Sequence, residues 1–236
     1  MMLRFIVLFL LLSGCSHSPL KTIPVDDSAL EPVAVLLFHL RLADGYEGNS
    51  RVIVSDKFMR IDEGEGSEDY ILFDRKQQII SNIVADDQTI FQLSGKPKPN
   101  NHSKIKWAVS IEKSHALIRS AQSQQLAAKH IELKLNGQPC YNLVAIENFL
   151  SDVVIAMRDY RRVLAQQNQS AISLLDDSDV CASAIQITDP DMSTAYGFPY
   201  REWGVNGYQR FLQTYHRQVI DPKWFQRPAG YAVYGM

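Results

Sequence analysis

Short segments rich in strand-forming residues, each followed at once by a turn, dominate the first part of this chain. Their Val, Ile, Phe and Tyr residues favour strands, and they occupy residues 33–42, 51–55, 58–62, 70–74, 78–83 and 89–93. Turn chemistry such as Asp44-Gly45 and Glu63-Gly64-Glu65-Gly66 separates them. A parallel crossover needs a dozen or more residues, so connections this short join antiparallel neighbours. The pattern predicts an antiparallel meander.

Two further segments extend this sheet. Ile105, Trp107, Val109 and Ile111 alternate with polar residues, and this period of two predicts a strand with its apolar set on one buried face. Residues 131–135 and 140–146 flank Asn136-Gly137, which is a strong signal for a two-residue hairpin because both positions tolerate positive φ.

Two stretches have helical spacing. The first is predicted to begin near Asn148 or Ser151, with an apolar face of Leu150, Val153, Met157, Tyr160 and Leu164 and a solvent face of Arg158, Asp159, Arg161 and Arg162. The second is predicted to begin near Asn206, with Tyr208, Phe211, Leu212, Tyr215 and Val219 on one face. The expected class is α+β, one antiparallel sheet with helices on one face, which either curls around a helix or lies flat beneath two. Residues 32–236 show no internal linker, so a single domain is expected.

The N-terminal residues predict the cellular location of the protein. Arg4 precedes the apolar run 5–12, which is too short to span a bilayer and is typical of a secretory signal. Leu12-Ser13-Gly14-Cys15 resembles the lipobox of bacterial lipoproteins, which implies cleavage before Cys15 and acylation of its thiol. Residues 1–14 are then a signal peptide, and the polar residues 15–31 a flexible tether. Ser16 in place of Asp resembles lipoproteins sorted to the outer membrane. The alternative is an ordinary secretory signal in which Cys15 is incidental.

The number of remaining cysteines agrees with this predicted location. The chain has three cysteines, and lipidation of Cys15 leaves Cys140 and Cys181 as an even number in an oxidising compartment. We therefore predict a Cys140–Cys181 disulfide; the alternative is two buried free thiols.

Further segments extend the resemblance beyond the lipobox. They are Phe58-Met59-Arg60-Ile61-Asp62 with Tyr70-Ile71-Leu72-Phe73-Asp74-Arg75, and Gly197-Phe198-Pro199 with Gly207-Tyr208-Gln209-Arg210-Phe211-Leu212. Together with the strand-rich first half, they resemble LolA/LolB-type periplasmic lipoproteins and related uncharacterised envelope lipoproteins. The resemblance implies a curved, half-barrel-like antiparallel sheet with two or more helices packed on one face. It also implies a concave face that holds an acyl chain or another apolar ligand, and no enzymatic activity.

Several classes of function lack support. A formal net charge of −2 does not provide the cationic surface that nucleic acids require. Ser110-Ile111-Glu112-Lys113 matches S-x-x-K, but the companion S-D-N and K-T-G motifs are missing. None of the six histidines is paired with another at i+2 or i+4, so no metal site is indicated. We expect no catalytic residues, no metal and no cofactor.

Two functional readings remain. The first is a carrier on the periplasmic face of the outer membrane that holds a lipid or another apolar or amphipathic ligand in the concavity of the sheet. Apolar strand faces plugged by Leu150, Val153, Met157 and Tyr160 would contradict it. The second is an assembly lipoprotein with a filled core that binds an envelope protein through a surface patch. An aromatic segment expected as a loop is the candidate lip or patch for either reading, unless it simply covers the sheet; it contains Tyr196, Phe198, Tyr200 and Trp203.

Overall fold

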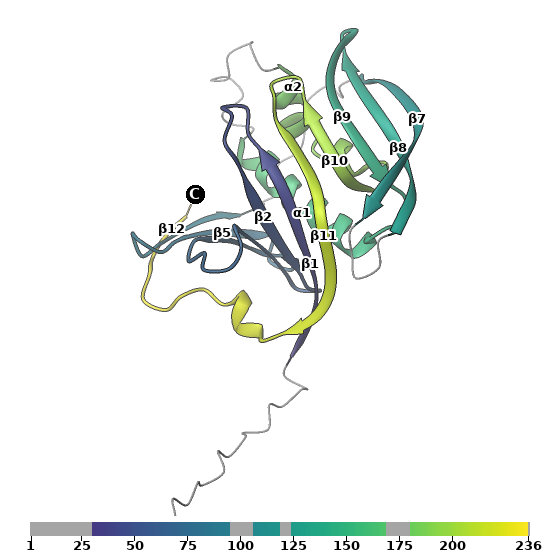
Figure 1. The fold of residues 1–236 in the computed structure, drawn as a ribbon. Helices are drawn as coiled ribbons and strands as arrows, with labels where there is room; N and C mark the ends of the chain where they lie inside the picture. Colours follow the sequence, from purple (N-terminus) through teal and green to yellow (C-terminus); the bar gives the residue numbers. More distant parts are fainter. Residues whose placement is uncertain (1–29, 95–105, 119–123, 169–179, 236) are drawn as a thin grey trace, which may run out of the picture.

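The computed structural model describes residues 30–94, 106–118, 124–168 and 180–235, and one twelve-stranded sheet dominates them (Figure 1). The strand order is β12-β6-β5-β4-β3-β2-β1-β11-β10-β9-β8-β7. Neighbouring strands are antiparallel except β12, which pairs in parallel with β6. Strands make up 53 % and helical segments 18 % of the structure. The predicted signal peptide, Cys15 and nearly all of the tether lie outside the described residues.

The strands have the following bounds: β1 (Glu31–Arg41), β2 (Glu47–Val54), β3 (Phe58–Asp62), β4 (Tyr70–Asp74), β5 (Ile79–Val84), β6 (Thr89–Ser94), β7 (Ala108–Ile118), β8 (Gln124–Leu135), β9 (Gln138–Ile146), β10 (Phe198–Gly204), β11 (Gln209–Ile220) and β12 (Ala232–Gly235). The helical segments are α1 (Ser151–Asn168), α2 (Val180–Ser183), η4 (Ala184–Thr188), η5 (Met192–Thr194) and η6 (Pro222–Phe225). Within the described ranges no helix is both long and apolar enough to cross a membrane.

The expected α+β class, a half-barrel-like sheet with two or more helices packed on one face, is wrong. The structure is largely sheet, and α1 is the one long helix among the described residues. The second predicted helix is instead β11, which pairs with β1 from Glu31↔Ile220 to Arg41↔Gln209 and with β10 on its other side. The backbone groups of β1 need a partner on that side, and this distant pairing overrides the local helical spacing.

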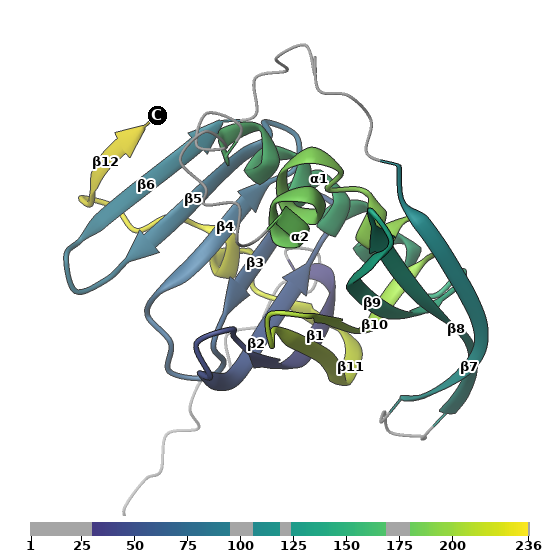
Figure 2. The same ribbon diagram turned by 90° about the horizontal axis from the view of Figure 1, so that it is seen from above.

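The sheet bends around α1 and α2, which lie on its inner face (Figure 2). Val153 and Met157 of α1 are buried in the same apolar cluster as Leu36, Met59 and Phe73 of the strands. These helical residues recur every three or four positions, so one stripe of α1 faces the sheet. An ion pair between Asp152 in the first turn of α1 and Arg217 of β11 lies at the N-terminus of the helix.

The opposite face of the sheet is covered by the chain that follows β11. Phe225 of η6 is buried with an apolar cluster that includes Ile53, Leu72 and Ile83. Side chains from the strands hold this segment in place: Arg60 Nη1 donates to the carbonyl of Trp224 at 3.0 Å, and the hydroxyl of Tyr70 donates to that of Gln226 at 2.6 Å. Buried Asp62 in turn pairs with Arg60 and with Arg51. Over strands β1 to β6 the sheet is therefore covered on both faces by different parts of the chain.

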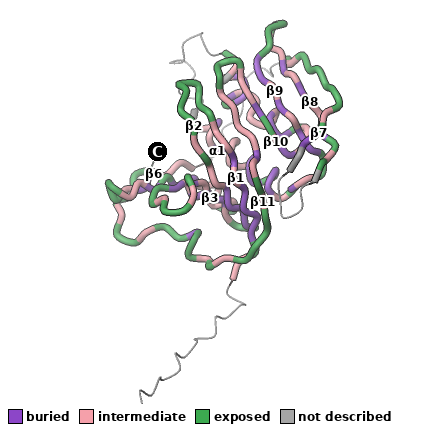
Figure 3. Tube along the Cα trace, in the orientation of Figure 1, coloured by how far each residue is buried: buried purple, intermediate pink, exposed green. Residues whose placement is uncertain are grey.

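Strand β7 departs from its predicted burial. Val109 and Ile111 are 41 % and 51 % exposed, and the strand is largely exposed in Figure 3. Their register partners on the neighbouring strand β8, Leu133 and Ile131, are fully buried, so the layer that covers this face ends before β7, the last strand of the sheet. Alternation correctly predicted a strand here, but the burial of its apolar face was wrong.

Candidate functional site

A cavity of about 510 Å³ lies where the ends of several elements meet. Its apolar walls come from the β1–β2 hairpin, α1, η4 and the β10–β11 turn, through Leu40, Leu42, Leu164, Ile185 and Val205. Its other lining residues are Cys140, Tyr141, Tyr160, Arg161, Cys181, Gln186, Glu202, Gly204, Asn206 and Tyr208. The volume falls within the range of about 300–1,000 Å³ that is typical of small-molecule sites. We call this space the α1-end cavity.

Buried charges lie at one side of the α1-end cavity. Glu202 of β10 is directly opposite Arg210 of β11 in the strand register, and its side chain is fully buried. Arg210 Nη2 lies 2.8 Å from Glu202 Oε1, and Arg161 Nη2 of α1 lies 3.0 Å from the same oxygen. The hydroxyl of Tyr208 donates to Oε1 at 3.1 Å. One carboxylate thus faces two guanidinium groups.

The protonation states of this cluster follow from its geometry. Burial by itself raises the pKa of Glu202, but Arg210 and Arg161 outweigh it and hold the pKa below the usual range. Burial and the charge of Glu202 both raise the pKa of Tyr208 and of Tyr141. Near neutral pH the cluster therefore holds one anion, two cations and two neutral hydroxyls.

The inner face of the sheet beneath α1 is filled rather than open. Leu150, Val153 and Met157 are all buried in the cluster that joins α1 to the strands. Tyr160 packs its ring edge-on against Phe73, with 5.8 Å between centroids, and also lines the α1-end cavity. This packing contradicts the predicted carrier that holds its ligand in the concavity of the sheet, because the four residues fill that concavity. The α1-end cavity is a separate space that lies beyond them.

The four predicted aromatic residues do not form one surface patch. Their segment is largely strand β10 rather than a loop, and Phe198 is fully buried, stacked on Phe38. Trp203 stacks on His130 at 5.4 Å between centroids. Tyr200 packs against the cluster beneath α1, and Tyr196 against a separate one that contains Cys140. These four side chains therefore do not provide a common surface on which a partner protein could bind.

The charged residues of the α1-end cavity were missed by sequence reasoning. Arg161 was placed on the solvent face of the helix, but its guanidinium reaches the buried carboxylate of Glu202. A signal for Glu202 was present, because a single carboxylate stands among aromatic residues in Tyr200-Arg201-Glu202-Trp203. Buried carboxylates need a cationic or hydrogen-bonding partner, and Arg210 stands eight positions later in the next strand.

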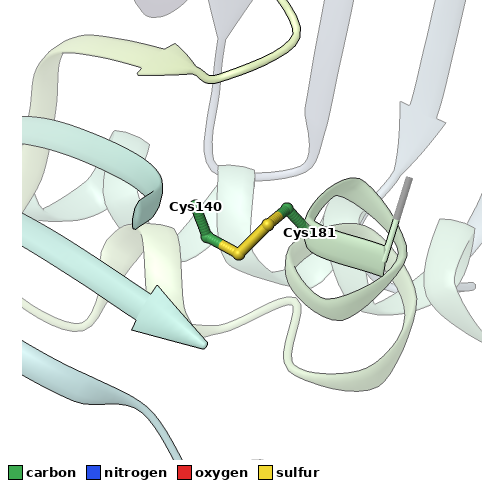
Figure 4. Close-up of a disulfide and its surroundings, with 2 residues drawn as sticks. All are labelled: Cys140 and Cys181. Atoms are coloured by element: carbon green, nitrogen blue, oxygen red, sulfur yellow. A yellow bond between two sulfur atoms is a disulfide. The ribbon is translucent and has the colours of Figure 1, made fainter. Parts of the chain in front are cut away.

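The predicted disulfide is confirmed. Cys140 of β9 and Cys181 of α2 are joined, with their Cα atoms 5.2 Å apart (Figure 4). Cys140 occupies an irregularity between β8 and β9, where the register shifts between Leu133 and Lys134. The bond fastens α2 to the start of β9, and both cysteines line the α1-end cavity. Cys15 lies outside the described residues, so its acylation remains a prediction.

No family model matches this chain. No curated protein matches it either. Among solved structures, it resembles an uncharacterized conserved protein from Thermus thermophilus, with a TM-score of 0.44 and 9 % identity over 89 % of this chain and 94 % of the other. It also resembles PNGF-II, with a TM-score of 0.41 and 7 % identity over 87 % of this chain but 31 % of the other. We draw no functional argument from likenesses this weak.

Proposed function

We propose that this chain is a non-enzymatic envelope lipoprotein that holds a single-chain amphipathic ligand in the α1-end cavity. The observation that supports it is the composition of that cavity, whose walls are apolar on several sides and whose Arg161 and Tyr208 contact Glu202. An acyl chain that lies against such walls is removed from water, which stabilises the complex by roughly 25 cal/mol per Å² of apolar surface buried. The few polar groups would fix the orientation of its head.

Exposed apolar residues mark a route into the cavity. Leu42, next to the tip of the β1–β2 hairpin, is 37 % exposed, and Val205 in the β10–β11 turn is 62 % exposed. Both residues line the cavity, and the two hairpins are neighbours because β1 pairs with β11. An acyl chain that enters here would remain in contact with apolar surface.

The lipobox supplies the location that we propose, the periplasmic face of the outer membrane. Residues 15–30 span at most roughly 55 Å when fully extended. Strand β1 leads from the end of this tether to the cavity, a distance of roughly 35 Å for 11 residues. A lipid on Cys15 therefore leaves the cavity within reach of the membrane surface.

The cavity is tested by filling it. We expect native mass spectra of the full-length protein in nonionic detergent to show one bound palmitate per chain when palmitate is added. Leu164→Trp in α1 should abolish the bound species, because the indole occupies the space of the ligand. Ile185→Trp in η4 should do the same, because Ile185 also lines the cavity.

The matched control is Ile155→Trp, which places the same indole on an exposed position of the same helix. It should retain palmitate. Circular dichroism shows whether each variant is folded. Equal occupancy in the wild type, Leu164→Trp and Ile185→Trp would refute the proposed site, as would a wild-type protein that binds neither palmitate nor another single-chain amphiphile.

Acylation is tested separately at Cys15. Cells of a Gram-negative host grown with radiolabelled palmitate should incorporate label into the wild-type chain and not into Cys15→Ser, because the thiol is the acylated atom. Cys140→Ser is the control and should keep the label. Sucrose-gradient fractionation should place the labelled protein with the outer membrane. Label on Cys15→Ser, or its absence from the wild type, would contradict the lipoprotein assignment.

A further inference from the structure

We infer that the α1-end cavity selects ligands whose head group carries a single negative charge, namely an acyl carboxylate or an acyl phosphodiester. This inference rests on the proposed function and names the ligand class. It goes beyond an apolar pocket, because apolar walls alone would accept neutral and charged single-chain amphiphiles in proportion to their chain length.

The first support is the charge balance. Among the residues that line the cavity, only Arg161 and Glu202 carry a charge at neutral pH, and Arg210, which does not line the cavity, adds a second cation at the same oxygen of Glu202. The side chains of Arg161 and Arg210 are only 20 % and 15 % exposed. Two largely buried cations against one buried anion leave one positive charge, which a singly charged anion would neutralise.

The second support is donor capacity beyond the ion pairs. Both hydrogen bonds from Arg161 to Glu202 use Nη2, which leaves its Nε and Nη1 outside this pair. Arg210 Nε and Nη2 are buried without a hydrogen-bond partner, but Arg210 does not line the cavity and its guanidinium lies over the ring of Phe38, so it contributes charge rather than donors. A guanidinium binds carboxylate or phosphate oxygens through two parallel N–H groups, and Arg161 is the guanidinium that lines the cavity.

The third support is the position of Arg161. It is on the same helix as Leu164, and both side chains line the cavity. An anionic head at Arg161 would therefore place the attached chain along the apolar wall that includes Leu164 and Ile185. Glu202 limits the preference to one negative charge, because it already neutralises one of the two cations.

The test compares head groups on one chain length. The full-length protein in nonionic detergent is titrated with palmitate, hexadecanol and hexadecylamine at pH 7.4, and bound ligand is counted by native mass spectrometry. Because each probe partitions differently into micelles, the readout for each probe is the apparent affinity of the wild type divided by that of Arg161→Gln. We expect a ratio of about ten for palmitate, as for a lost charge-assisted hydrogen bond. The expected ratio is near one for hexadecanol and below one for hexadecylamine.

Arg162→Gln is the matched control. It removes the same charge from the adjacent residue, which pairs with Asp191 outside the cavity, and its ratios should stay near one for all probes. A fourth probe, 1-palmitoyl-lysophosphatidylglycerol, distinguishes the two sources of a single negative charge. A ratio of about ten for palmitate alone identifies a carboxylate as the preferred head group. A ratio of about ten for the lysolipid alone identifies a phosphodiester.

The failures are distinguishable. If Arg161→Gln changes the affinity for all probes by the same factor, charge selection is refuted and the proposed function stands. If no probe binds the wild type, the proposed function itself fails.

Discussion

Glu202→Gln is expected to lower the free energy of unfolding by about 3–5 kcal/mol at pH 7, as when one partner of a buried ion pair is removed. Glutamine keeps the shape of the side chain and its hydrogen-bonding capacity but removes its charge. Arg161 and Arg210 would then remain largely buried beside each other with no anion between them.

Urea unfolding of the full-length protein, followed by circular dichroism, measures this effect. The control is Glu47→Gln, because Glu47 forms an exposed pair with Arg41 and such pairs contribute at most about 1 kcal/mol. A loss for Glu202→Gln no greater than that of Glu47→Gln would mean that the guanidinium groups do not depend on the carboxylate.

The difference between wild type and Glu202→Gln should also depend on pH. The folded state holds the pKa of Glu202 below its unfolded value, because Arg210 and Arg161 outweigh the effect of burial. The ionised carboxylate therefore contributes its full stabilisation above the unfolded pKa of about 4.3. This contribution is lost as the pH falls towards the folded pKa. Unfolding curves at pH 7, 5 and 3.5 should show the difference shrinking only below about pH 4.3, and a constant difference would contradict the assigned ionisation.

Removal of the Cys140–Cys181 disulfide is the second large effect that we expect. The double variant Cys140→Ala/Cys181→Ala should have a free energy of unfolding lower by about 4 kcal/mol. The bond closes a loop between positions 41 apart, and without it the unfolded chain gains conformational entropy. Alanine at both positions avoids a free thiol. Because the bond fastens α2 to β9 beside the cavity, the variant should also bind palmitate more weakly.

Urea unfolding with and without dithiothreitol checks the origin of this loss. The reductant should lower the midpoint of the wild type towards that of the double variant, and it should leave the double variant unchanged. A wild-type midpoint that does not respond to reductant under unfolding conditions, together with an equally stable double variant, would show that the bond contributes nothing to stability.

The strands of the first half could be predicted closely, because their information is local. The predicted segments 58–62 and 70–74 have the same bounds as β3 and β4. Asn136 and Gly137 have φ values of 53° and 81°, as the hairpin signal requires. The helix predicted to begin near Asn148 or Ser151 begins at Ser151 as α1.

Three features required the tertiary structure. The residues of β11 have helical spacing, but they form a strand because β1 on one side and β10 on the other supply its hydrogen bonds. The apolar face of β7 is exposed because the strand lies at the edge of the sheet. The helical pattern predicts that Arg161 faces solvent, because it does not show which distant strand carries the counter-ion of this residue.

By itself, the sequence determined the antiparallel meander, the hairpin, the long helix and the cysteine pair, because short turns, period-two alternation, helical spacing and cysteine number are properties of neighbouring residues or of simple counts. Only the tertiary structure decided that the chain is largely sheet and that α1 fills the concavity of that sheet. It also decided that Arg161, Glu202 and Arg210 meet beside a cavity. Those outcomes depend on backbone hydrogen bonds and charge pairs between segments far apart in the chain, such as Arg161 and Glu202, whose energies arise only once the sheet has formed.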